Sequence, residues 1–165
     1  MLTDDDIREL LEERKLLSMT ALASLKSPKK VVGVSLRASV SCRSTTGKRF
    51  SILACKQKRP NKFSVHVRYH PTGRRKPVTL IRCNGFQAAH ENVLEKSKIP
   101  HNTFHIHMLT ERYQAFERKE LAFAKHTEAY HSFDSAVEYI CFSYGFFFND
   151  HPYSERYPLF PESNQ

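Results

Sequence analysis

The sequence predicts an α+β fold in which a curved antiparallel β-sheet of about five or six strands carries an N-terminal and a C-terminal helix on one face. Two observations predict this fold. Apolar residues alternate with polar ones through much of 31–113, as in strands that are buried on one face, and apolar residues follow helical spacing near both ends. The length of 165 residues suits a single domain, residues 1–165, with its own core.

The N-terminal segment predicts a helix over 3–17. The Thr3 hydroxyl can cap free amides, and the carboxylates of Asp4–Asp6 favour the positive end of a helix. Residues 18–30 are expected to be a connector, because Pro28 and the lysines after it resist regular structure.

Alternation then predicts an antiparallel sheet over 31–113. In the first expected strand, one face carries Val32, Val34, Leu36, Ala38 and Val40. Residues 86–101 are polar and are expected to be irregular. The further expected strands are 49–56, 63–70, 78–83 and 103–109.

The second half of the chain predicts more helix. Residues 112–128 suggest a short helix, and 132–146 predict the C-terminal helix, with Ser132 as its N-cap. The tail, 147–165, is rich in aromatics and prolines and is expected to dock as an extended strap or to fray.

Composition narrows the function classes. The net charge of +9 favours polyanionic partners, and nucleic acid, RNA above all, is the expected partner. No stretch approaches the roughly 18 consecutive apolar residues of a membrane-spanning helix, so no membrane partner is expected. The acidic N-terminus is unlike a secretory signal, and the four cysteines lack a Cys-x-x-Cys pair, so we expect a cytoplasmic protein with reduced thiols.

Histidines and arginines share one side of two predicted strands. In 63–70 the polar side carries His66, Arg68 and His70, and in 103–109 His105 and His107 point the same way. If both strands belong to one sheet, the face opposite the helices presents imidazole and guanidinium groups to solvent.

Such a face suits RNA cleavage without a metal, which needs a base, an acid and cations around the phosphate. The candidate acid–base set is His105, His107 and Glu111, and no cofactor is expected. Candidate phosphate ligands are Arg68, Arg82 and Arg112.

Two other interpretations of these residues stay open. His-x-His on a strand is a metal-ligand geometry that His90 or His101 could complete, which would favour a metal-dependent hydrolase. The interleaved basic and aromatic residues of 63–69 could instead hold single-stranded nucleic acid without cutting it, although core packing is the better expectation for Phe63 and Tyr69.

Three sequence motifs show a family resemblance: Arg82-Cys83-Asn84-Gly85, His90-Glu91-Asn92, and the stretch from His105 to Tyr113. They resemble a family of small, largely uncharacterised bacterial proteins with an Arg-Tyr-Asn-Gly turn and a His-Ile-His-x-x-Thr-Glu-Arg-Tyr motif. Cys83 replaces the tyrosine of that turn. Positions carried over from the family pattern are Arg82, Asn84, Gly85, His90, Asn92, His105, His107, Thr110, Glu111, Arg112 and Tyr113.

The resemblance implies a compact α+β domain from genomes rich in mobile elements and toxin–antitoxin modules. In overall plan the chain looks like barnase-like and RelE-like ribonuclease toxins, an analogy at the level of fold. We therefore expect a toxin-type endoribonuclease with a possible cognate antitoxin, or else a non-catalytic nucleic-acid-binding or inhibitor protein of a mobile element. The expected nucleic-acid contacts are His66, Arg68, Arg82, Asn84, His90, Asn92 and Arg112.

Overall fold

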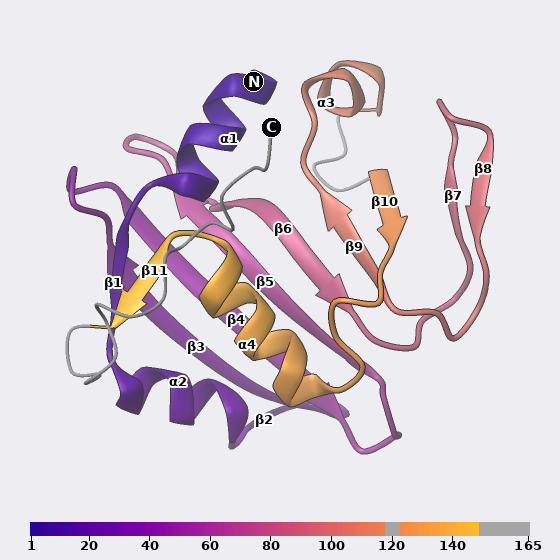
Figure 1. Ribbon diagram of the computed structural model, residues 1–165, viewed down its shortest axis with the longest axis horizontal. Coiled ribbons are helices and arrows are strands. Elements are labelled where there is room, and N and C mark those ends of the chain that lie inside the picture. Colours follow the sequence, from indigo (N-terminus) through magenta and orange to yellow (C-terminus); the bar gives the residue numbers. More distant parts are fainter. Residues whose placement is uncertain (118–122, 149–165) are drawn as a thin grey trace, which may run out of the picture.

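A seven-stranded antiparallel sheet forms the centre of the computed structural model, which describes residues 1–117 and 123–148 (Figure 1). The strand order is β10-β9-β6-β5-β4-β3-β2. The predicted α+β class is confirmed, with more strands than the sequence predicted. The strands are β2 (Lys30–Val32), β3 (Ser35–Arg43), β4 (Arg49–Gln57), β5 (Phe63–His70), β6 (Val78–Asn84), β9 (His105–Met108) and β10 (Phe123–His126).

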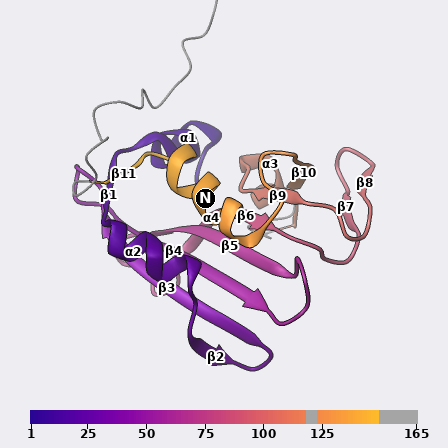
Figure 2. The same ribbon diagram turned by 60° about the horizontal axis from the view of Figure 1, so that its bottom comes forward.

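Helices lie against one face of this sheet (Figures 1 and 2). Helix α4 (Phe133–Ser143) packs on β5, and α2 (Met19–Lys26) packs on β3 and β4. Helix α1 (Asp4–Glu12) and helix α3 (Glu111–Glu117) stand at the end of the sheet where Asp4 accepts a hydrogen bond from the Glu111 amide. The buried apolar side chains form one cluster between helices and sheet, as the alternation in β4 and β5 predicts.

The N-terminal prediction was right only in its first part. Thr3 caps α1 in a capping box, but the helix ends at Glu12. Residues Lys15–Leu17 form β1, which pairs in parallel with β11 (Phe146–Phe148). Long-range pairing outweighs the local helical spacing there.

The connector predicted for 18–30 was wrong. The Ser18 hydroxyl accepts a hydrogen bond from the Ala21 amide and so caps α2. Leu22 and Leu25 of this helix are buried in the core, which stabilises a segment with little amphipathic pattern.

Three further stretches differ from expectation. The strand expected from residue 31 is broken at Gly33, whose φ of +58° lets the chain reverse between β2 and β3. Residues 86–101 are not irregular, since β7 (His90–Asn92) and β8 (Ser97–Ile99) pair as a hairpin. The sheet also extends past residue 113, because β10 adds to β9.

The remaining elements agree closely with the sequence. Strand β5 has the predicted bounds, and β4 and β6 are each one residue longer. Ser132 caps α4 as predicted, but the helix ends at Ser143, before β11 begins. Of the predicted tail, residues 147 and 148 belong to β11, and 149–165 lie outside the described residues.

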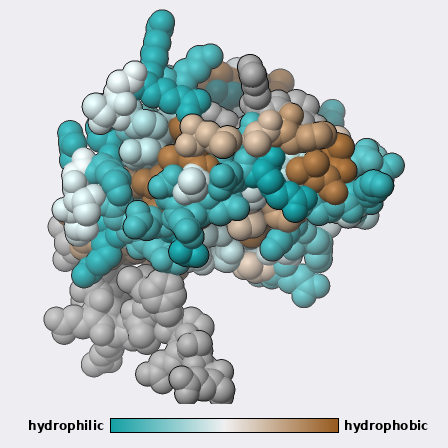
Figure 3. All heavy atoms as spheres, turned by 90° about the horizontal axis from the view of Figure 1, so that it is seen from above, coloured by the Kyte–Doolittle hydropathy of each residue, from teal (hydrophilic) through white to brown (hydrophobic). Residues whose placement is uncertain are grey.

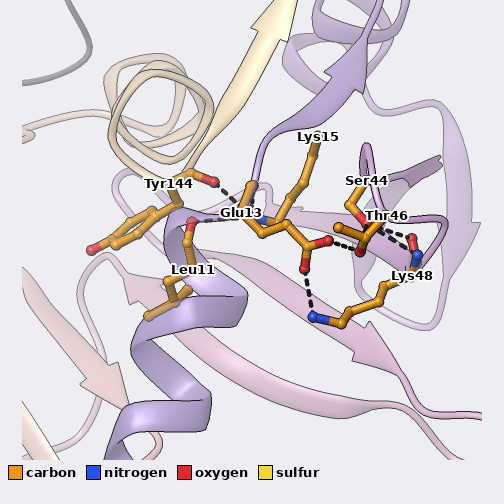
Figure 4. Close-up of polar contacts among 7 residues, drawn as sticks. All are labelled: Leu11, Glu13, Lys15, Ser44, Thr46, Lys48 and Tyr144. Carbon is orange, nitrogen blue, oxygen red and sulfur yellow. Dashed lines mark hydrogen bonds and ion pairs between the residues drawn. The ribbon is translucent and has the colours of Figure 1, made fainter.

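Lys15 connects the end of α1 to the end of α4 (Figure 4). Its fully buried ammonium donates to the carbonyl oxygens of Leu11 (3.0 Å), Glu13 (2.6 Å) and Tyr144 (3.2 Å). The rings of Phe50 and Phe146 face the same ammonium. The lysine thus satisfies carbonyls at the end of α1 and at the end of α4.

Figure 3 views the molecule from above Figure 1, and most of this end is hydrophilic, with apolar side chains in small patches. Within the described residues, no helix has both the length and the apolar character needed to cross a membrane.

Candidate nucleic-acid interface

The sheet face opposite the helices, here called the polar face, is built from arginine, histidine and serine. Cross-strand register places its positions side by side from β3 to β9. In the described part of these strands, no position of the polar face is an Asp or Glu. The polar face comprises Arg37, Ser39, Ser41, Arg43, Arg49, Ser51, Leu53, Cys55, Ser64, His66, Arg68, His70, Thr79, Arg82, Asn84, His105 and His107.

The predicted histidine strands do share this face, although they are not neighbours. Strand β6 lies between β5 and β9, and it contributes Arg82. The register pairs His66 with Arg82 and Arg82 with His107, so a guanidinium stands between two imidazoles. In the adjoining row, Asn84 pairs with His105.

Arg68 is held in place by serines. Its Nε donates to Ser51 Oγ and its Nη2 to Ser39 Oγ, both at 3.1 Å. His70 Nε2 lies 2.8 Å from the same Ser51 Oγ. The hydroxyls orient the guanidinium without neutralising its charge.

Exposure falls steadily across the polar face. Arg37 and Arg43 on β3 are exposed, whereas His66, Arg68 and Arg82 on β5 and β6 are half-buried. His105 and His107 on β9 are only 2% and 3% exposed. The arginine end is therefore open to a large ligand, and the histidine end is closed.

The β7–β8 hairpin closes the histidine end. The His90 ring lies 4.6 Å from the His107 ring and 6.5 Å from the His105 ring, centroid to centroid. Two residues later, the Asn92 amide accepts from the Ala124 amide and donates to the Ala124 carbonyl, both at 2.8 Å. Asn92 thus pairs with the edge strand β10 as a peptide group would.

A second contact holds the tip of the hairpin. Glu95 forms an ion pair of 2.6 Å with Arg112 and accepts a hydrogen bond from the Tyr113 hydroxyl, both on α3. The Tyr113 oxygen in turn accepts from the Leu94 amide. Arg112 therefore holds the tip of the hairpin and lies away from the row of Arg82.

A hydrogen-bond chain fixes His105. Its Nδ1 lies 2.7 Å from the Thr103 carbonyl oxygen, which can only accept, so Nδ1 carries a proton. Its Nε2 then accepts from Asn84 Nδ2 at 3.2 Å. Asn84 Oδ1 and Arg82 Nε are buried without a hydrogen-bond partner, which leaves one acceptor and one donor unused in these two adjoining rows.

Burial and nearby positive charge lower the pKa values of His66, His70 and His105. Burial, together with the charges of Arg82, Arg68 and Arg37, lowers the pKa of His66 to about 3. Burial also lowers the pKa of His105, with smaller contributions from His90 and Arg82. The pKa of His70 is lowered by burial and by Arg68 and Arg49. In all three histidines positive charge adds to the effect of burial on the pKa, and an anion would offset that part.

The structure separates Glu111 from the predicted acid–base set. Strand β9 ends at Met108, and Glu111 begins α3, where its amide donates to Asp4 at 2.8 Å. Glu111 therefore contacts α1, away from the strand that carries His105. Phe63 and Tyr69 lie on the core side, as expected, so the polar face offers no aromatic ring from β5.

For residues 1–117 and 123–148, no group of three or more His, Cys, Asp or Glu side chains is arranged to hold a metal ion. His101, the other histidine considered as a ligand, instead accepts from the Ala89 amide at 3.3 Å.

Sequence reasoning missed part of the polar face. Arg37, Arg43 and Arg49 extend the arginines over β3 and β4, and Ser39 and Ser51 orient Arg68. The period-2 alternation of 35–43 and 49–57 carries the signal for these residues, since they fall on the side opposite Ala38, Val40, Phe50 and Ile52.

No protein-family model matches the sequence, no curated protein matches it, and no solved structure matches the fold. The resemblance to a bacterial family and to ribonuclease toxins therefore stays a prediction.

Proposed function

We propose that this protein binds nucleic acid, with the phosphate backbone lying across the polar face. The observation that carries the proposal is the composition of that face: five arginines and no carboxylate on the described strands. In the described residues, no salt bridge joins any of these arginines to an acid. Planar guanidinium groups that lack acidic partners are suited to phosphate.

The dimensions of the face suit a chain of phosphates. Arg37 and Arg43 are six residues apart on β3, a separation of about 20 Å along a strand. Neighbouring strands add about 4.8 Å each, so several phosphates can be contacted at once. A membrane surface is a poorer fit, because such binding needs apolar side chains to insert, and this face offers mostly arginine, histidine and serine.

A labelled single-stranded RNA of about 20 nucleotides tests the proposal, with affinity measured between about 50 and 200 mM NaCl. We expect log affinity to fall linearly with log salt. Arg37→Gln and Arg49→Gln should each weaken binding and reduce the magnitude of the slope by about 0.7. Arg8→Gln is the matched control, because Arg8 is an exposed arginine on α1 that pairs with Asp5.

Binding that is absent at low salt, or that Arg8→Gln weakens as much as Arg37→Gln does, would refute the proposal. A cytoplasmic location belongs to the same proposal, since the four cysteines are all free thiols.

Cleavage of the bound RNA without a metal is the second candidate function. The observation that favours it is the gathering of three imidazoles beside Arg82: the His105 and His107 rings are 5.0 Å apart, and the His90 ring is stacked on His105 and edge-on to His107. In such a site one imidazole would take the 2′-OH proton, another would protonate the leaving oxygen, and Arg82 would stabilise charge on the phosphate. Because both β9 histidines are buried, the hairpin must open before they touch RNA.

Cleavage in EDTA by wild type, and its loss in the His105→Gln, His107→Gln double variant, would support this second function. Binding with no cleavage in EDTA or with added Zn²⁺ or Mn²⁺ would leave a non-catalytic nucleic-acid-binding protein. The toxin-type role and its cognate antitoxin depend on cleavage, and growth arrest on expression that a neighbouring small open reading frame relieves would support them.

A further inference from the structure

The edge strand β2 is open. It ends the sheet at the side opposite β10, and Lys30, Val31 and Val32 are all exposed (Figure 2). Within the described residues, β3 is the one strand that pairs with it. The free side of β2 therefore presents backbone donors and acceptors to solvent, as edge strands do.

Apolar side chains surround this edge. Val31 is 70% exposed and Val34 78% exposed, and Leu36, which pairs with Val31, is also exposed. The turn does not require a valine at position 34, because Gly33 supplies the positive φ that the chain reversal needs. None of these three side chains belongs to the core cluster. Exposed apolar groups gathered at one place are typical of a binding surface.

Basic side chains complete the surface. A groove of 750 Å³, here called the β2 groove, is lined by Val31, Val34 and Leu36 and by Lys58, Arg59 and Lys62 from the β4–β5 connection. In the described chain, no Asp or Glu lines it. The groove thus combines apolar contacts and positive charge on the Val31 side of β2, next to its free edge.

We propose that the β2 groove binds an extended acidic segment of a partner protein, which adds to the sheet as one further strand. The segment's backbone would pair with β2, and its alternate apolar side chains would pack on Val31 and Leu36. Its carboxylates would lie on the other face of the added strand, near Lys30 and Arg37, which pair across β2 and β3. Charge complementarity selects this occupant.

Other occupants fit less well. A second copy of the chain would bring its own Lys29 and Lys30 close to Lys29 and Lys30 of the first copy, and such like charges oppose edge-to-edge pairing. Nucleic acid has no peptide groups to pair with β2 and gains nothing from Val31 or Val34. The two proposals can be tested separately, because Val31 and Val34 are not positions of the polar face.

A fluorescein-labelled peptide of about ten residues that alternates glutamate and valine is the probe, titrated into the full chain and followed by anisotropy. We expect Val31→Lys and Val34→Lys each to weaken binding about tenfold or more. Val93→Lys is the matched control, because Val93 is an exposed valine at the tip of the β7–β8 hairpin. A peptide with N-methyl groups at alternate residues should fail to bind, since it cannot pair with a strand edge.

Four results would overturn the proposal. These are no peptide binding at about 1 mM, equal binding by Val31→Lys and wild type, equal binding of the N-methylated peptide, and wild-type self-association that Val31→Lys abolishes. The last result would assign the groove to a second copy. RNA binding measured on the same variants separates this test from the proposed function, since Val31→Lys should leave RNA affinity unreduced.

Discussion

Removing the Asn92 side chain should detach the β7–β8 hairpin from the sheet and uncover the buried histidines. Asn92 is 5% exposed and bonds both backbone groups of Ala124, which is 1% exposed. In Asn92→Ala, a buried N–H and a buried C=O lose their partners. Each group costs about 1–3 kcal/mol if it stays dry, so the closed hairpin should lose about 2–6 kcal/mol relative to an open one.

Histidine reactivity reports this opening. Diethylpyrocarbonate modifies accessible neutral imidazoles, and mass spectrometry locates each adduct. Because a factor of ten corresponds to about 1.4 kcal/mol, a loss of about 2 kcal/mol should speed modification of His105 and His107 by about thirtyfold. The exposed His131 serves as an internal standard whose rate should not change.

Glu91→Ala is the matched control, since Glu91 lies on the same strand but is exposed. It should leave the reactivity of His105 and His107 at the wild-type level. If Asn92→Ala lowers the stability of the protein but modifies these histidines no faster than Glu91→Ala does, the hairpin is not their cover, and hairpin opening cannot be the route by which RNA reaches them.

Three other changes test the surroundings of the site. Tyr130→Phe removes a buried hydroxyl that lies 3.1 Å from the Asn84 carbonyl and 2.7 Å from the His105 carbonyl, and it should cost about 1–2 kcal/mol in urea unfolding. Lys15→Met should cost about 2–4 kcal/mol, because three carbonyls lose their donor. Burial lowers the pKa of Lys15 to about 8, so the folded state loses this proton first, and wild type should gain stability relative to Lys15→Met as pH rises from 8 towards 10.5. The pKa of His66 is lowered from 6.5 to about 3, so wild type should lose up to about 5 kcal/mol as pH falls through this range, and His66→Gln should not show this loss.

The polar face could be predicted because a single periodicity governs it. In β5 apolar and polar residues alternate strictly, and in β4 Phe50, Ile52 and Ala54 share the core side, although Leu53 lies on the polar face. A strand with one buried face must present its other residues together. The relation of His66 to His107 could not be predicted, since it depends on β6 lying between their strands in a register shifted by a bulge after Val67. Local pattern gives the faces of strands but not their neighbours.

The parts of the site that sequence reasoning misplaced depend on long-range contacts. Asn92 was expected to bind nucleic acid, but its side chain bonds to Ala124, a residue 32 positions away with no local signal. Glu111 was expected beside His107 because the two are close in sequence. The chain leaves the sheet at Met108, and α3 carries Glu111 to the end of the molecule where α1 lies.

The positive charge that adds to burial in lowering the pKa of His66 should couple nucleic-acid binding to proton uptake. The charges of Arg82, Arg68 and Arg37 help to keep His66 neutral, and a phosphate bound among these arginines would cancel part of their field. The pKa of His66 must then rise in the complex, and by linkage affinity must increase as pH falls. Calorimetric titrations of RNA in two buffers of different ionisation enthalpy at mildly acidic pH measure this uptake directly. His66→Gln should reduce it, whereas uptake unchanged by that substitution would place the phosphate away from the row of His66, Arg82 and His107.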